Sequence, residues 1–222
     1  VAVGYTDVFL ITSPDNEAFQ EWVGSARTGN SFAGAKVHFA IQHLKGGREK
    51  PLGTADAVEQ AMQQYPALLD ETFTICNGDN LYSEGAFKQL LQNRKTPNAL
   101  ISYARSSLKF SDERIGKFAV MDIDSEGFLN GIIEKPDAQT AEKYQDSKGE
   151  IRVSMNIFSF HGGQLYPYLK NCPIHPERQE KELPTAIKML NENEPKQIIC
   201  FGREEHILDL TSAQDIAAFD EM

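Results

Sequence analysis

Apolar runs of strand length alternate with stretches of helical periodicity along the first half of the chain, and this alternation restricts the fold more than any other feature. Residues 8–12 (VFLIT) form a continuous apolar run that Ser-Pro-Asp-Asn ends, which is typical of a buried strand. Residues 54–65 carry apolar side chains at the helical period and end before Pro66, so they predict a helix. Strands and helices that alternate in this way indicate an α/β domain with a mainly parallel sheet.

The pattern changes in the second half of the chain. Residues 117–122 and 128–133 are strand-like runs joined by Asp-Ser-Glu-Gly, which predicts a hairpin. Residues 153–160 (VSMNIFSF) predict another long strand, and residues 213–219 a last helix. No repeat or linker divides the sequence. We therefore expect an α/β fold with a Rossmann-like mixed, mainly parallel sheet flanked by helices, an antiparallel hairpin insertion, and a single domain over residues 1–222.

The charge of the chain limits its partners. Acidic residues outnumber basic ones by 32 to 22, which gives a formal net charge of −10. Such a charge repels phosphate backbones and anionic lipids, so we expect no nucleic acid and no membrane as partner. An anionic small molecule would need a local cationic site or a divalent metal. The three cysteines are far apart, which favours a reducing, cytoplasmic compartment.

Polar residues and glycines that directly follow predicted strands are the first candidates for a site, because open α/β sheets bind ligands beyond the carboxyl ends of their strands. Gln42 ends the second predicted strand, and its amide can donate to and accept from a nucleobase. Gly53 and Thr54 open a helix, where a base or phosphate could approach the main chain. The motif alone favours the alternative for this pair, a plain glycine turn with Thr54 as N-cap.

Two aspartates stand at strand ends. Asp79 follows an apolar strand within Asn-Gly-Asp-Asn, where a carboxylate is suited to hold Mg²⁺ while substrate phosphates complete the coordination. Asp209 ends the short run Ile-Leu-Asp. Each also has an ordinary explanation, Asp79 as an Asx-turn residue and Asp209 as the neighbour of a helix cap. Two such aspartates that meet in one sheet would form a metal site.

A third group of candidates lies around the hairpin and the long strand. Glu134 can accept hydrogen bonds from sugar hydroxyls, and Lys135 supplies a point charge for phosphate, although the two also fit a surface ion pair. Asn156 interrupts an apolar strand, so its amide needs a partner from the main chain or from a ligand. Gly116 precedes the hairpin, where it allows close approach of a ligand or merely makes a bend.

One tempting pattern predicts no site. Asp122-Ile123-Asp124 spells the Asp-x-Asp metal pair of nucleotide-sugar glycosyltransferases, but Ser-Glu-Gly follows at once and indicates a solvent-exposed turn. The five histidines are scattered and pair with no Cys or Asp at ligand spacing.

The order of five blocks resembles the sugar-1-phosphate nucleotidyltransferase (nucleotide-sugar pyrophosphorylase) family: KPLGTADAV, TFTICNGDNLY, IGKFAVMDIDSEGFLNGIIEKP, SMNIFSF and ILDLTSAQDI. The resemblance implies the nucleotide-diphospho-sugar transferase fold. It also implies a reaction in which a nucleoside triphosphate and a sugar 1-phosphate form a nucleotide-sugar and pyrophosphate, with Mg²⁺ as cofactor. On this basis Asp79 and Asp209 bind the metal, and Lys135 acts with them in catalysis. The residues implied for the nucleotide are Gln42, Gly53 and Thr54, and those implied for the sugar phosphate are Gly116, Glu134, Lys135 and Asn156.

One family feature does not occur in the sequence. The family begins with a strand and a glycine-rich loop, GxGTRxxPxxxxPKP, which wraps the triphosphate. That strand lies in the middle of the family's sheet, so a domain without it has two unpaired edges, and we expect a preceding segment or another chain to supply it. The alternative is a protein that naturally lacks the loop and serves as a non-catalytic, nucleotide-sugar-binding regulatory subunit. A glycosyltransferase of related fold is a third hypothesis. The base, the sugar and a homo-oligomeric state stay open.

Overall fold

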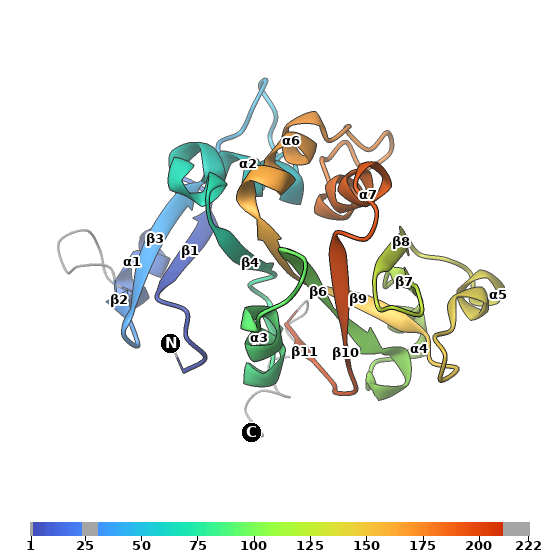
Figure 1. The fold of residues 1–222 in the computed structure, drawn as a ribbon. Helices are drawn as coiled ribbons and strands as arrows, with labels where there is room; N and C mark the ends of the chain where they lie inside the picture. The colour runs from blue at the N-terminus through green and yellow to red at the C-terminus, as the bar shows by residue number, and fades with distance from the viewer. Residues whose placement is uncertain (1, 24–30, 211–222) are drawn as a thin grey trace. The chain divides into compact units, whose positions relative to one another are not determined.

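A computed structural model describes residues 2–23 and 31–210 of the chain. The chain forms two compact units, one made of residues 1–71 and 162–189 and the other of residues 72–161 and 190–222 (Figure 1). The expected helix over residues 213–219 lies outside the described residues. The prediction of a single domain stays a prediction.

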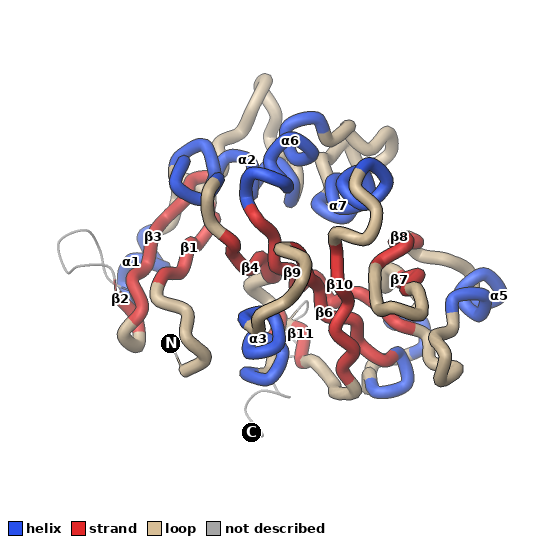
Figure 2. Tube along the Cα trace, in the orientation of Figure 1, coloured by secondary structure: helices blue, strands red, loops and turns tan. Residues whose placement is uncertain are grey.

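The first unit is a three-stranded sheet with helices. Its strands follow the order β1 (Asp7–Thr12), β3 (Ala35–Ile41) and β2 (Ser31–Phe32), with β1 parallel and β2 antiparallel to β3. The helices are α1 (Glu17–Val23), α2 (Thr54–Gln64), α6 (Gly162–Asn171) and most of α7 (Leu183–Asn193), and η1 (Pro66–Leu69) is a 3-10 turn (Figure 2). Ala55, Val58, Ala61 and Met62, which predicted α2, are all buried.

Two glutamines of α2 hold the end of β3 in place. The side-chain amide of Gln64 donates to the carbonyl of Ile41 and accepts from its N–H, both at 2.9 Å. Gln60 does the same for His43, at 3.1 and 2.9 Å. These side chains take the place of a neighbouring strand at the carboxyl end of β3. The main chain on both sides of Gln42 is therefore fixed.

The second unit contains a six-stranded sheet in the order β10-β6-β9-β7-β8, with β4 on β9 as well. The strands are β4 (Thr72–Cys76), β6 (Asn98–Ala104), β7 (Val120–Ile123), β8 (Leu129–Ile133), β9 (Arg152–His161) and β10 (Ile198–Arg203). A separate antiparallel pair joins β5 (Asn80–Leu81) to β11 (Leu208–Asp209). The short helices are α3 (Glu84–Leu91), α4 (Asp112–Ile115) and α5 (Ala138–Ala141), with 3-10 turns η2 (Arg105–Ser107) and η3 (Glu142–Tyr144).

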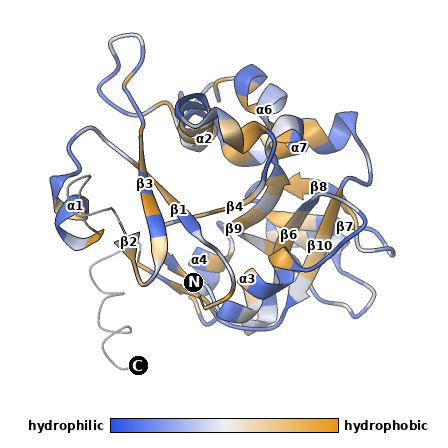
Figure 3. Ribbon diagram, turned by 60° about the vertical axis from the view of Figure 1, so that its left-hand side comes forward, coloured by the Kyte–Doolittle hydropathy of each residue, from blue (hydrophilic) through white to orange (hydrophobic). Residues whose placement is uncertain are grey.

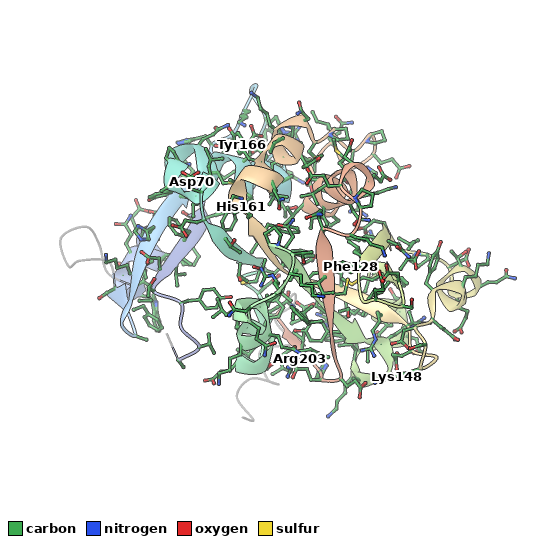
Figure 4. All side chains as sticks on the ribbon, viewed as in Figure 1. Asp70, Phe128, Lys148, His161, Tyr166 and Arg203 are labelled. Carbon is green, nitrogen blue, oxygen red and sulfur yellow. The ribbon has the colours of Figure 1, made fainter. Side chains whose placement is uncertain are left out.

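The core of the second unit lies on β6 and β9, which carry mostly buried residues, among them Tyr103 and Ile157 (Figure 3). A polar contact fixes α3 beside this sheet. Arg203 at the end of β10, labelled in Figure 4, donates to Glu205 at 2.7 Å and to Gln89 of α3 at 3.2 Å. A side chain at Gly85 would place its Cβ 2.7 Å from the Arg203 guanidinium, which would then have to move.

The mixed α/β architecture and the β7–β8 hairpin confirm the sequence prediction. The expectation of a mainly parallel sheet is wrong for the described strands, because parallel pairing is limited to β1–β3 and β6–β10. The long strand β9 runs antiparallel to β4, β6 and β7, which makes most of the second sheet antiparallel. Within the described residues β1 pairs only with β3, and β4 pairs only with β9. β1 and β4 therefore each have one unpaired edge. Val8 and Ile11 of β1 are 39% and 37% exposed, although an apolar parallel strand is usually covered on both faces. No described helix is both long and apolar enough to cross a membrane.

Candidate functional site

Gln42 is held by two acceptors of its own unit. Its amide nitrogen Nε2 donates to the carbonyl of Gly53 and to Oδ2 of Asp56, both at 3.0 Å. Both N–H groups of the amide are therefore used within the protein, and no described residue donates to Oε1. A nucleobase that meets Gln42 would present a donor to this oxygen.

Asp56, which the sequence reasoning missed, is the centre of that network. Its carboxylate is completely buried and also accepts from Lys45 Nζ and Gln60 Nε2, each at 2.7 Å. Burial raises the pKa of Asp56, but the hydrogen bonds from Lys45, Gln42 and Gln60 outweigh it, so the pKa lies below its usual value. The signal that the sequence offered was an acid in the first turn of a predicted helix, on the face that also carries Ala55 and Gln60.

Gly53 and Thr54 contact another part of their own unit. Gly53 has φ of 107°, and a Cβ there would lie 2.5 Å from the carbonyl oxygen of Lys181. The Thr54 hydroxyl accepts a hydrogen bond from the N–H of Leu183 at 2.9 Å. The N-cap position belongs to Gly53, so the interpretation of Thr54 as the N-cap is wrong. The absence of a side chain at residue 53 is already explained by this close packing, and a ligand is not needed to explain it.

The segments that carry Asp79 and Asp209 lie side by side in the second unit although 130 positions separate the two residues. Asp209 ends β11 opposite Asn80 of β5, and the N–H of Leu210 donates to the carbonyl of Asp79 at 2.7 Å. The side chain of Asn80 is shielded, and its Nδ2 has no partner among the described residues.

Arg114 is a member of this cluster that the sequence reasoning missed. Its Nη2 lies 2.7 Å from Oδ2 of Asp209, with side chains 27% and 11% exposed. Its guanidinium carbon lies 4.5 Å from the centre of the Phe110 ring. Arg114 is in α4, which Gly116 ends, so the same short helix carries a predicted sugar residue and the partner of a predicted metal ligand. No periodicity relates residues 114 and 209, and only the fold brings them together.

Asn156 reaches the same cluster through Tyr82. The Tyr82 hydroxyl lies 2.6 Å from the carbonyl of Met155, 3.3 Å from that of Asn156 and 3.2 Å from Oδ1 of Asn80. Asn156 interrupts the register between β9 and β6 and has φ of 56°. Bulges and strained main-chain conformations are over-represented next to active sites, where they change the direction of a side chain. No described hydrogen bond uses the Asn156 side-chain amide.

The remaining predicted residues are less closely connected. Lys135 follows β8, is exposed and has φ of 43°. The described hydrogen bonds and ion pairs do not join Lys135 to Asp79 or Asp209. Glu134 is also exposed, and Gly116 has an ordinary helical φ of −63°. The second unit thus places the main chains of Asp79 and Asp209 side by side and links them to Asn156 through Asn80 and Tyr82. Arg114 links Asp209 to α4, which Gly116 ends.

Of the two hairpin aspartates, Asp124 stabilises the turn, and Asp122 is a strand residue. Asp124 Oδ1 accepts from the N–H groups of Glu126 and Phe128 at 2.9 and 2.8 Å. Asp122 lies in β7 opposite Gly131.

The donor set around Asp79 and Asp209 is chemically suited to Mg²⁺. Carboxylate oxygens are its preferred ligands, and a site completed by substrate phosphates and water needs only one or two of them from the protein. Over residues 2–23 and 31–210 no group of three or more His, Cys, Asp or Glu side chains forms a metal cage. The pair therefore fits an ion that arrives with a triphosphate.

Comparisons with known proteins agree on one family. The model of the Nucleotidyl transferase family matches residues 1–216. A glucose-1-phosphate adenylyltransferase from Koribacter versatilis is 29% identical over 119 residues, which are 53% of this chain and 27% of that protein. A bifunctional protein GlmU from Staphylococcus saprophyticus is 26% identical over 148 residues, 66% of this chain and 30% of that protein. The matched part of the chain thus spans less than a third of the length of these relatives.

A solved structure shows the same fold. A Bacillus anthracis protein assigned as a glucose-1-phosphate thymidylyltransferase, in complex with sucrose, superposes with a TM-score of 0.65 at 15% identity. The match covers 97% of this chain and 75% of that one.

Proposed function

The chain belongs to the nucleotidyl transferase family, as the sequence predicts, and from that premise we propose that its protein joins a nucleoside triphosphate to a sugar 1-phosphate. An oxygen of the sugar phosphate attacks the α-phosphorus, the bond to the β-phosphate breaks, and pyrophosphate leaves. Transfer of this kind needs orientation and neutralisation of charge and no covalent enzyme intermediate.

The observation that carries the proposal is the hydrogen bond of 2.7 Å between the main chains of Asp79 and Leu210, which joins the segments that carry the two aspartates. Mg²⁺, when bound, would neutralise the phosphates of the triphosphate. In this proposal Asp79 and Asp209 hold the ion. The Asn156 side chain binds the sugar phosphate, and Lys135 adds positive charge for it.

In the proposal Gln42 binds the nucleobase, with Oε1 as the acceptor of a hydrogen bond. Gly53 supports it indirectly, since its carbonyl orients the Gln42 amide. Thr54 holds the start of α2 against Leu183. The names of two relatives favour a glucose 1-phosphate as the sugar substrate, and the base stays open. An aqueous, cytoplasmic setting is part of the proposal.

The test is release of pyrophosphate by the full-length protein from glucose 1-phosphate and each common triphosphate, with Mg²⁺ or with EDTA. The D79N and D209N variants should lose activity, whereas the double variant D122N/D124N, in the hairpin of the same unit, should keep it. If no triphosphate gave pyrophosphate release, the proposal would be refuted. Binding of a nucleotide-sugar without turnover would favour the regulatory subunit, and loss of activity in D122N/D124N would favour a glycosyltransferase.

A further inference from the structure

Arg114 stands out because it contacts a proposed metal ligand while it belongs to none of the predicted motifs. We propose that Arg114 is a positioning residue, which fixes the carboxylate of Asp209 in the orientation that a divalent cation requires. This inference rests on the proposed function, because the role of Asp209 comes from it.

The ion pair between Arg114 and Asp209 is placed so that it can fix the orientation of the Asp209 carboxylate. Nη2 of Arg114 lies 2.7 Å from Oδ2 of Asp209 and 3.4 Å from its main-chain carbonyl. The guanidinium thus faces the side chain and the main chain of the same residue. With the Asp209 side chain 11% exposed, the pair is better shielded than a surface salt bridge, which typically contributes little.

Aromatic rings hold the guanidinium itself. Arg114 lies over Phe110 at 4.5 Å, and the Phe110 ring makes edge contacts with Phe118 at 5.6 Å and His206 at 4.8 Å. A planar guanidinium can stack on such a ring and still direct its N–H groups sideways, which the ammonium of lysine cannot do. The rings therefore fix Arg114, and Arg114 fixes Asp209.

The short strand that carries Asp209 explains why its carboxylate needs a side-chain partner to fix its orientation. β11 has two residues and pairs only with the two-residue β5 among the described strands. So short a ladder fixes the main chain at Asp209 and leaves the carboxylate orientation to side-chain contacts. A carboxylate offers about four lone-pair positions on two oxygens, so one guanidinium does not exhaust its capacity to bind an ion. Metal-binding carboxylates are commonly oriented in this way, and loss of the orienting partner typically weakens metal binding by about 10- to 100-fold.

The experiment measures Mn²⁺ binding to the full-length protein by the EPR signal of free Mn²⁺, independently of turnover. R114Q should bind Mn²⁺ about 10- to 100-fold more weakly than wild type, and R114K should recover part of the loss because it keeps the charge. K117Q removes one positive charge three residues away, from an exposed ion pair with Glu113, and should stay within about twofold. The D209N variant shows how much Mn²⁺ binding weakens when the proposed metal ligand itself is lost.

Each outcome decides between the claims. Weak Mn²⁺ binding by both D209N and R114Q, with K117Q unaffected, supports the positioning role of Arg114. Weak binding by D209N with unchanged or tighter binding by R114Q overturns the inference and leaves the proposed function standing, because Arg114 would then be inert or a competitor of the ion. Unchanged binding by D209N overturns both, since the ion would lie elsewhere.

A second variant guards against a fold defect in R114Q. F110L keeps the ion pair and removes only the aromatic platform, so we expect binding about two- to fivefold weaker than wild type. If F110L binds as tightly as wild type and R114Q has lost its thermal transition, a structural role replaces the positioning role.

Discussion

Replacement of Asp56 tests whether the network around Gln42 has the strength that its geometry indicates. In D56A the amide nitrogens of Gln42 and Gln60 each lose an ionised acceptor, and Lys45, 43% exposed, turns to water. Hydrogen bonds to a charged group contribute about 1.5–3 kcal/mol each, so two of them give about 3–6 kcal/mol. At roughly 2–4 °C per kcal/mol for a chain of this size, the melting temperature should fall by about 6–24 °C.

D56N should cost less, about 1–2 kcal/mol, since its oxygen still accepts from the two amides while the ion pair with Lys45 is lost. Asp70, an exposed aspartate of the same unit labelled in Figure 4, supplies the control, and D70A should stay within about 0.5 kcal/mol of wild type. Far-UV circular dichroism against temperature measures all three variants. If D56A melts with wild type and D70A, Asp56 does not hold the network together.

The pH dependence follows from the direction of the shift. Because the pKa of Asp56 in the folded protein lies below its unfolded value, the carboxylate stabilises the fold fully above the unfolded pKa of about 3.9. This contribution is lost as the pH falls through the folded pKa. The difference in stability between wild type and D56A should therefore be constant from about pH 5 to 8 and shrink below about pH 4. A difference that grew on acidification would contradict the reasoning.

Three further substitutions test single positions. G53A forces a Cβ to 2.5 Å from the carbonyl of Lys181 at φ of 107°, so its melting temperature should fall by an amount that corresponds to about 1–3 kcal/mol; an unchanged value would refute the close packing. G162A places a Cβ 1.9 Å from the carbonyl of Leu68 and should melt lower still, which the same scan checks. N156G suits φ of 56° and should keep wild-type stability while it raises the KM for the sugar phosphate, whereas N156A should impair both; a normal KM in N156G would remove Asn156 from the site.

Local signals in the sequence were sufficient for the longer elements. The apolar run VFLIT became β1, and the helical period of residues 54–65 became α2, because burial of one face decides both patterns. The hairpin followed from the turn residues between β7 and β8.

Contacts between distant segments were beyond the reach of such signals. Gly53 faces the main chain of Lys181, and Arg114 faces Asp209, 95 positions further on. Neither pair shares a period or a motif. The bulge at Asn156 could not be predicted either. One amide within an apolar strand is compatible both with a buried residue in regular register and with a bulge that changes the direction of its side chain.

The most direct test of the central claim follows the α-phosphate itself. The full-length protein is given an α-³²P-labelled triphosphate with glucose 1-phosphate and Mg²⁺, and the labelled products are separated. The account predicts label in a nucleotide-sugar, an equal amount of unlabelled pyrophosphate, and loss of both with EDTA, in D79N and in D209N. It would be contradicted if no triphosphate gave a labelled nucleotide-sugar, or if D79N and D209N formed it as fast as wild type.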